Sequence, residues 1–503
     1  MTSAGLLSDK GLLKWKAALH YKGEASVIGA KSPFFLSAKG HSDPIAELNA
    51  AIDALKSDPN AQCKYPARLD LLLKQGAIEL NDLPSATCDD YQTYLRKVPF
   101  DRVYIVFVAE DHSAAESQMG HTILKIAGED DQNITREHSF SFMALMRENG
   151  NFTRYISAVF DGTEGSYVLA PYAKTIETYI YGANRSLWEF EIILSDEAKE
   201  RLRKHLWELK ETPILYQFIT HNCNTAIEAI LNAADGRYAD DKHWLFATPV
   251  EYLQLLEERD LIGDISVRPS AIDKVYFAQN RSFYPLNAPS ASRVSVHIFD
   301  GGFTIEAMPN YRDMRSVANA SAIEVENKLI EIAALYENDK AYLERLDLIA
   351  MKTIADFTNA GSSKLFRLGV ETSGRDRLSP FAEWGRGAGI APFEGVLLYA
   401  MPRVGFAQGK RANLYAAIET GAIARVGTRS KILINYTRFF DVNKDYRGFE
   451  GELNAHIVFA PTKDYDISVA YRSRFDRDDR FEPFDRGDRN GRDRLSIGAS
   501  VYF

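Results

Sequence analysis

The sequence predicts an α+β domain that is preceded by a helical segment and followed by an all-β antiparallel barrel of the outer-membrane type. Three observations carry this prediction. In residues 1–99, apolar residues recur at helical spacing and prolines stand at the starts of the expected helices. Strand-like and helical runs are mixed over residues 100–290, and short apolar-polar alternation recurs over residues 291–503. These three ranges are the expected domains.

The first range contains several amphipathic stretches. Leu12 to Leu19 has helical spacing, Asp43-Pro44 opens a helix that runs through Leu55, and Pro66 opens another. Proline fits the first turn of a helix because its missing N–H would have no intrahelical partner there. We expect these helices to cap the domain that follows.

The middle range begins with a predicted buried strand. Val103–Val108 is a continuous apolar run, as expected of a strand covered on both faces. His121–Ile126 and Glu137–Phe142 then form a predicted hairpin that turns near Gly128–Asp131. This register brings His121 roughly opposite His138, at about 5 Å, so His138 is either a residue that orients the His121 ring or an incidental histidine on an exposed strand face. A slip of one residue would place the two rings on opposite faces.

A cysteine lies in the motif Thr220–Thr225, at the start of a predicted helix. Apolar residues recur at helical spacing after Cys223. Unpaired N–H groups and the helix dipole at such a position favour thiolate over thiol. Cys223 is therefore a candidate nucleophile with His121 as its base, and Asn222 or the Cys223 N–H is a candidate oxyanion donor. A small buried cysteine and a packed strand histidine are the alternatives.

From Arg293 onward, short alternating segments are bounded by glycine, aspartate, asparagine or charged turns. One predicted helix, Ala320–Tyr336, interrupts them, and a polar stretch, Asp476–Arg489, is expected to be a solvated extracellular loop. The last segment ends on the aromatic Phe503, as outer-membrane barrel strands typically do, although a soluble barrel or sandwich has the same alternation. The predicted strands are Val294–Ile298, Leu365–Val370, Leu414–Ile418, Ile432–Tyr436, Ile467–Tyr471 and Leu495–Phe503.

Composition narrows the class of protein. The chain has 503 residues, 46% hydrophobic and 26% charged, which is the profile of folded protein. A formal net charge of -9 argues against a nucleic-acid binder. No apolar run reaches the roughly 18 residues of a spanning helix, so a membrane span would have to consist of strands. The first residues lack the pattern of a secretory signal, which indicates either a cytoplasmic chain or a signal trimmed from this numbering.

The three cysteines bear on the compartment. Cys63 and Cys88 lie near each other, and Cys223 is far away in the sequence. Pairing the first two would leave Cys223 as a free thiol in an oxidising compartment, and three unpaired structural cysteines are the alternative.

No metal or cofactor is expected. The histidines and cysteines show no HExxH, CxxC or histidine-rich spacing, so a zinc site is not predicted. A glycine-rich phosphate loop after a strand is also missing, and nothing indicates a nucleotide or redox cofactor.

Several motifs, taken in order, resemble one family. Gly120–Ile126 is similar to its glycine-histidine strand, and further motifs follow in the family's order. By these motifs the chain resembles the periplasmic domain of Lnb-type bacterial lipoprotein N-acyltransferases, a permuted relative of NlpC-like and papain-like cysteine enzymes. Cys63–Arg68 is also similar to a motif upstream in related chains. The further motifs are Asp161–Tyr167 with Pro171-Tyr172, Asn184–Phe190, His205–Leu209 and Asn222–Thr225.

The resemblance implies a permuted papain-like fold and thiol acyl chemistry. We expect cofactor-independent acyl transfer or hydrolysis at the periplasmic face of the outer membrane, through a thioester on Cys223. A phospholipid donor and a lipoprotein amino terminus as acceptor follow from the resemblance alone. The alternatives are a peptidoglycan peptidase or amidase of the NlpC kind, and a non-enzymatic barrel or transport protein whose cysteine domain is a degenerate plug.

Overall fold

The computed structural model describes residues 7–110, 119–144, 162–210, 212–217, 221–242, 248–271, 273–274, 284–317, 323–357, 362–373, 377–408, 412–442, 449–475 and 493–503. The chain divides into two compact units, one within Met1–Ala271 and one from Ile272 to Phe503. Each unit is described by itself.

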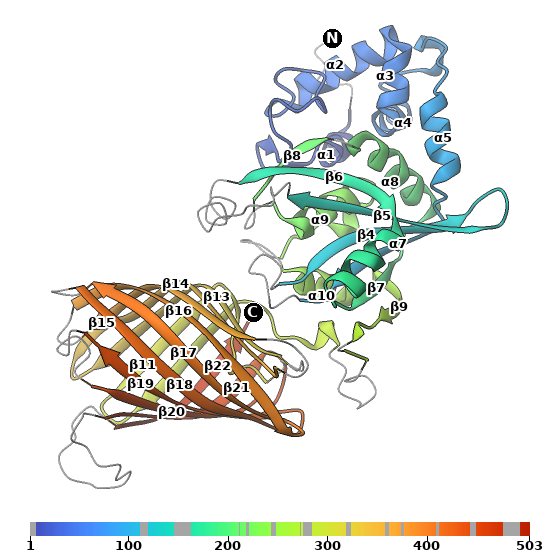
Figure 1. The fold of residues 1–503 in the computed structure, drawn as a ribbon. Coiled ribbons are helices and arrows are strands. Elements are labelled where there is room, and N and C mark those ends of the chain that lie inside the picture. The colour runs from blue at the N-terminus through green and yellow to red at the C-terminus, as the bar shows by residue number, and fades with distance from the viewer. Residues whose placement is uncertain are drawn as a thin grey trace. The chain divides into compact units, whose positions relative to one another are not determined.

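Unit 1 opens with short helices that begin where local capping predicts. Asp43 accepts hydrogen bonds from the Ile45 and Ala46 N–H groups and so caps α2, while Pro66 starts α4. Cys63 and Cys88 form a disulfide, which confirms that pairing. The elements of this segment are α1 Asp9–Ala18, β1 Tyr21–Lys22, β2 Ala25–Ser26, α2 Pro44–Ser57, α3 Pro59–Lys64, α4 Pro66–Lys74, η2 Leu80–Asp82 and α5 Asp89–Lys97 (Figure 1).

A buried charge cluster ties this segment to the rest of unit 1. Arg68 is fully buried and forms ion pairs with Glu47 at 2.8 Å and with Glu208 at 3.3 Å. Beside it, the Nε2 atoms of His20 and His205 lie 2.8 Å apart. Glu208 and His205 belong to α8, so the first helices pack on the domain through paired polar groups as well as apolar ones.

The centre of unit 1 is a seven-stranded antiparallel sheet in the order β8-β6-β5-β4-β3-β7-β9. The predicted buried strand is confirmed: β3 is Arg102–Val108, and its residues after Arg102 are buried. The other strands are β4 His121–Glu129, β5 Thr135–Ala144, β6 Thr163–Pro171, β7 Leu187–Ile192, β8 Pro213–Tyr216 and β9 Ile262–Arg268.

Helices complete unit 1 and carry much of its apolar core. α9 contacts β4 and β5, as well as α8 and α1. Ser195 caps α8 by accepting a hydrogen bond from the Ala198 N–H. The helices are α7 Tyr172–Ile176, the π-helical turn η4 Glu177–Gly182, α8 Asp196–Leu209, α9 Cys223–Ala234, η5 Gly236–Tyr238 and α10 Pro249–Glu258 (Figure 1). No helix in the described ranges is long and apolar enough to cross a membrane, a finding that does not bear on spans made of strands.

Unit 2 is a closed antiparallel barrel whose neighbouring strands follow one another in sequence. β11 and β12 pair with β13 in one continuous register and act as a single wall strand, so the described residues form 12 strands around the ring. β10 closes the ring by pairing with β22. After η6 Pro285–Asn287 the strands are β10 Arg293–Phe299, β11 Gly302–Met308, β12 Asn310–Arg312, β13 Ile323–Glu337, β14 Lys340–Ala355, β15 Ser363–Ser373, β16 Arg377–Phe393, β17 Val396–Gln408, β18 Ala412–Val426, β19 Ser430–Asp441, β20 Gly451–Phe459, β21 Tyr465–Phe475 and β22 Asp493–Tyr502.

The predicted helix Ala320–Tyr336 is wrong, because residues 323–337 form strand β13. Ala320 itself lies outside the described residues, as does the predicted loop Asp476–Arg489. The Glu, Lys, Ala and Leu residues of this segment favour a helix locally. Its charged side chains, however, have partners inside the barrel. Glu331 is fully buried and pairs with Arg345 of β14 at 3.1 Å. Tertiary pairing therefore overrides the local preference.

The barrel wall separates apolar from charged side chains. Along β10, Val294, Val296 and Ile298 are exposed, whereas Arg293, Ser295 and His297 are buried. An apolar outer surface and a polar interior are typical of barrels that span the outer membrane. Exposed aromatic residues also lie near the strand ends on the side where the chain enters: Phe357, Phe393, Phe459, Tyr465 and Phe503.

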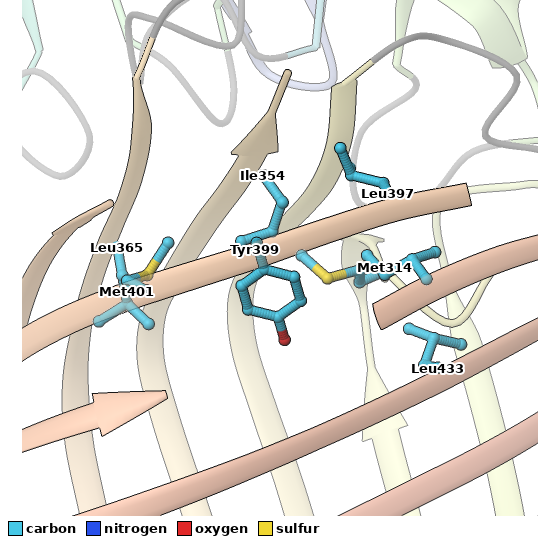
Figure 2. Packing of buried hydrophobic residues seen from close by; sticks show 8 residues of the cluster. Met314, Ile354, Leu365, Leu397, Tyr399, Met401 and Leu433 are labelled. Atoms are coloured by element: carbon cyan, nitrogen blue, oxygen red, sulfur yellow. The ribbon is translucent and has the colours of Figure 1, made fainter. Parts of the chain in front are cut away.

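Side chains from distant strands meet inside the barrel. Met314, in the segment after β12, packs with Leu397 and Tyr399 of β17 and Leu433 of β19 (Figure 2). Glu324 of β13 pairs with Arg425 of β18 at 2.6 Å. Lys352 of β14 pairs with Glu419 of β18, and Glu344 of β14 pairs with Arg472 of β21 at 3.0 Å. These strands are not neighbours in the sheet, so the pairs cross the lumen.

Candidate functional site

Cys223 is the first residue of α9, as predicted. Asn222 is the N-cap: its side-chain oxygen accepts hydrogen bonds from the Asn224 N–H at 3.0 Å and the Thr225 N–H at 3.1 Å. The cap fixes where the helix begins and therefore where the sulfur lies. Cys223 is 6% exposed, and it is the free cysteine in the described residues.

His121 is the first residue of β4 and pairs with Val108, the last residue of β3. It lies within hydrogen-bonding reach of the Cys223 thiol, as does the backbone N–H of Thr122. The structure thus brings together the two residues that the sequence analysis chose as nucleophile and base.

The backbone conformation at the start of the glycine-histidine motif requires a glycine. Gly120 has a φ of +81°, a region that side chains rarely adopt. A Cβ atom at this position would also run into the Phe107 ring and the Val108 carbonyl oxygen. Gly120 therefore lets the chain turn tightly into β4 and place His121 at the strand end.

The environment of Cys223 lowers its pKa. Burial by itself raises the pKa of the thiol, because a thiolate is poorly solvated there. The charge of His121 and hydrogen bonds from His121 and Thr122 act in the opposite direction and bring the pKa from the model-compound value of 9.0 to about 7. A large fraction of the cysteine is then thiolate near neutral pH, which suits a nucleophile.

His138 does not lie opposite His121, so the predicted register is wrong. His138 pairs with Ile126, five residues along β4 from His121. Paired residues share a face and successive residues alternate, so the two histidines lie on opposite faces of the sheet. The Asp130 side chain accepts from the Gln132 and Ile134 N–H groups and moves the turn beyond the predicted position. An orienting role for His138 through cross-strand contact is therefore overturned.

The remaining residues of the cysteine motif shape the loop before α9. His221 and Gln217 form an antiparallel bridge, with N···O distances of 2.8 and 3.1 Å. Thr220 and Asp161, from two of the quoted motifs, lie outside the described residues. Cys223 is the first residue of α9, and the first N–H groups of a helix have no intrahelical acceptor, so its backbone N–H is in a position to donate to a ligand.

Two residues of the site were missed by sequence reasoning. Thr122 follows His121 directly and was noted only as part of the strand motif. Tyr179 lies on η4, and its ring centroid is 6.2 Å from that of His121. No periodicity in the sequence marks Tyr179, because its placement depends on the π-helical turn.

The fold and this site define a class: an α+β domain with a thiol-histidine pair, on a chain that continues into an antiparallel barrel. Residues 90–259 match the family of the Lnb N-terminal periplasmic domain, so this segment is a domain of that family. Residues 10–75 match a domain of unknown function, DUF7843. No curated protein matches the chain.

Solved structures similar to the chain include outer-membrane proteins. The NanC porin shares 9% identity over 42% of this chain and 100% of its own, with a TM-score of 0.27. Omp33 of Acinetobacter baumannii shares 10% identity over 43% of this chain and 100% of its own, with a TM-score of 0.23. The barrel is defined by its own strand pairing.

The compartment follows from the two units. The domain at residues 90–259 belongs to a periplasmic family. The barrel carries apolar side chains outside and ion pairs inside, which is the outer-membrane pattern. The protein is therefore periplasmic and outer-membrane.

Proposed function

We propose that this protein is a cysteine-dependent acyltransferase or hydrolase that works through a thioester on Cys223. One observation carries the proposal: Cys223, the first residue of α9, lies within hydrogen-bonding reach of His121, which lowers the pKa of the thiol. A buried structural cysteine without such neighbours would have a raised pKa.

The reaction would proceed in two balanced halves. His121 takes the proton of Cys223, and the sulfur attacks an ester or amide carbonyl carbon. The Cys223 N–H stabilises the oxyanion, the bond from the carbonyl carbon to the leaving group breaks, and His121 returns the proton to that group. An amine or water then loses a proton to His121 and attacks the thioester. The carbon–sulfur bond breaks, the acyl group leaves on the acceptor, and the sulfur regains its proton.

We propose a phospholipid as acyl donor and the amino terminus of a lipoprotein as acceptor. The family resemblance of the cysteine domain supports this choice, and the barrel supports it by holding the chain in a membrane where both molecules occur. Peptidoglycan peptide bonds are the competing substrate, since the same two residues would serve a peptidase.

The barrel is proposed to be an anchor and not a transport channel. The pairs Glu324–Arg425, Lys352–Glu419 and Glu344–Arg472 join strands that are not neighbours. Each pair bridges the space that a solute would have to cross. This observation weighs against the reading in which the barrel is the functional part.

The test uses the full chain in detergent micelles that contain phosphatidylethanolamine with radiolabelled acyl chains. Label should appear on the protein, should be released by neutral hydroxylamine as expected of a thioester, and should be absent from Cys223→Ala. Cys63 and Cys88 are in a disulfide, so labelling reports on Cys223. Strongly reduced label is expected for His121→Ala. An unlabelled wild-type protein would contradict a phospholipid donor.

A further inference from the structure

We propose that Tyr179 is a positioning residue that holds the His121 ring against Cys223, and that Arg185 holds Tyr179 in place. The proposal rests on the proposed function, because it assigns these residues to the same thiol-histidine pair. It also gives a role to the Asn184–Phe190 motif, which the reaction steps do not use.

The His121 ring needs support from packing. Its Nε2 atom is buried and has no hydrogen-bond partner in the part of the chain that the structure describes. A ring held at one side only can turn about its χ angles. The Tyr179 ring lies beside it, with centroids 6.2 Å apart and ring planes inclined by 38°. This distance lies within the range of a favourable aromatic pair.

Tyr179 is itself anchored. Its half-buried side chain packs on an apolar cluster that includes Val108 and Ile123, the residues that flank His121 across and along the sheet. Burial raises the pKa of the Tyr179 phenol; the charge of Arg185 acts in the opposite direction, Cys223 adds to the rise, and the net shift keeps the group neutral. Tyr179 therefore acts through its ring and not as an acid or base.

Arg185 connects Tyr179 to the strand that carries the partner of His121. Its guanidinium carbon lies 5.3 Å from the centroid of the Tyr179 ring, within reach of a cation–π contact. The Arg185 Nε donates to the Ala109 carbonyl at 2.6 Å, and the Arg185 backbone N–H donates to the Tyr179 carbonyl at 2.8 Å. Arg185 is 6% exposed, so these contacts are largely shielded from water.

Tyr179 lies on a π-helical turn. Within Glu177–Gly182 the helix is widened, and the Ala183 N–H bonds the Thr178 carbonyl at 3.0 Å, a span of five residues. Such turns are frequent at functional sites. Tyr181, two residues further on, is 79% exposed. The turn thus carries two tyrosines in different environments, and Tyr181 is a matched control.

The experiment measures the rate of Cys223 alkylation by iodoacetamide as a function of pH, on the full chain in detergent. Wild type should show a midpoint at about 7, and His121→Ala should move it toward the ordinary value near 9. Tyr179→Leu should raise the midpoint by about one unit or more, because a displaced His121 no longer favours the thiolate. Tyr179→Phe keeps the ring and should restore it, and Tyr181→Leu should leave it unchanged.

A double variant separates positioning from loss of structure. If Tyr179 acts through His121, Tyr179→Leu should not shift the midpoint further in the His121→Ala background. Arg185→Gln should produce a smaller shift in the same direction as Tyr179→Leu. A wild-type midpoint that is low and depends on His121, but does not change in Tyr179→Leu, overturns the positioning role alone. A wild-type midpoint near 9 that His121→Ala does not alter overturns the proposed function itself.

Discussion

His121, the first residue of β4, lies within hydrogen-bonding reach of Cys223, the first residue of α9. The positions of these two residues depend on one local feature at the start of each element. Gly120 turns the chain into β4, and the Asn222 cap fixes the start of α9. Each feature can be tested separately from the chemistry.

Replacing Asn222 separates the helix cap from the charge at the site. Asn222→Ala should reduce the free energy of unfolding by about 1 kcal/mol, because two helix N–H groups lose their acceptor. Asn222→Asp should retain the cap, yet raise the pH midpoint of Cys223 alkylation, since a carboxylate beside the sulfur disfavours the thiolate. Urea unfolding and alkylation of the same preparations check the two effects. Equal midpoints in wild type and Asn222→Asp would contradict the electrostatic account.

Gly120→Ala should damage the site more than an ordinary glycine substitution. Gly120 and Gly23 both have positive φ, +81° and +70°, but only Gly120 would bring a Cβ atom against its surroundings. Gly23→Ala should cost about 1 kcal/mol and Gly120→Ala clearly more. Labelling of Cys223 should fall only in Gly120→Ala. Similar losses in both variants would show that the close contact with Phe107 does not matter.

His138→Ala should leave the alkylation profile of Cys223 unchanged. Its ring faces the side of the sheet opposite His121, so its removal does not touch the thiol. A raised midpoint in this variant would restore the role that the sequence analysis gave it.

The His20–His205 pair should make the folded state sensitive to acid. Burial, with Arg68 nearby, lowers the pKa of His20 from 6.5 to about 3, and burial lowers that of His205 well below 6.5. Between pH 6.5 and 3 the unfolded chain therefore binds protons that the folded chain does not, and stability falls as pH falls. Glu208, whose pKa burial raises to about 7, acts in the opposite direction, so a difference between variants is needed.

The comparison is wild type against His20→Gln in urea titrations from pH 7 to pH 4. The stability advantage of wild type should shrink by up to about 1.4 kcal/mol per pH unit below 6.5, because only wild type loses the His20 contribution. The carboxylates are common to both proteins, so their contribution largely cancels. A difference that stays constant across this range would contradict the burial of a neutral His20.

The ion pairs across the lumen predict that the barrel does not conduct ions. In planar bilayers the wild-type chain should show no steady conductance. A Lys352→Gln, Glu419→Gln, Arg472→Gln variant removes two of the crossings and should pass ions, since the opposing side chains no longer hold each other. Steady wild-type channels would contradict the anchor role and favour transport.

The helix starts and the alternating strands could be predicted from the sequence because they depend on residues that are close together in the chain. Asp43 before Pro44, Ser195 before α8 and Asn222 before α9 are caps, and each sits within three residues of the N–H groups that it accepts from. The alternation in β10 and β22 is equally local, because one face of the wall is exposed and apolar and the other is buried and polar.

Side-chain hydrogen bonds within a turn and pairing between strands account for the errors. The β4–β5 register depends on the Asp130 side chain and on Asn133 at a φ of +56°, which together move the turn. Strand β13 looks helical until its charged residues are paired with β14. Tyr179 contacts His121 from the π-helical turn η4, and no spacing rule in the sequence indicates that contact.

The most direct test of the central claim is the mass of the Cys223 peptide after the full chain is incubated with phospholipid. A fatty acyl mass is expected on that peptide. The adduct should be lost when an amine acceptor is added, and should be strongly reduced in His121→Ala. An unmodified Cys223 peptide with phospholipid, together with a muropeptide adduct when peptidoglycan fragments are supplied, would contradict the lipid assignment. An unmodified peptide in both cases would contradict thiol catalysis.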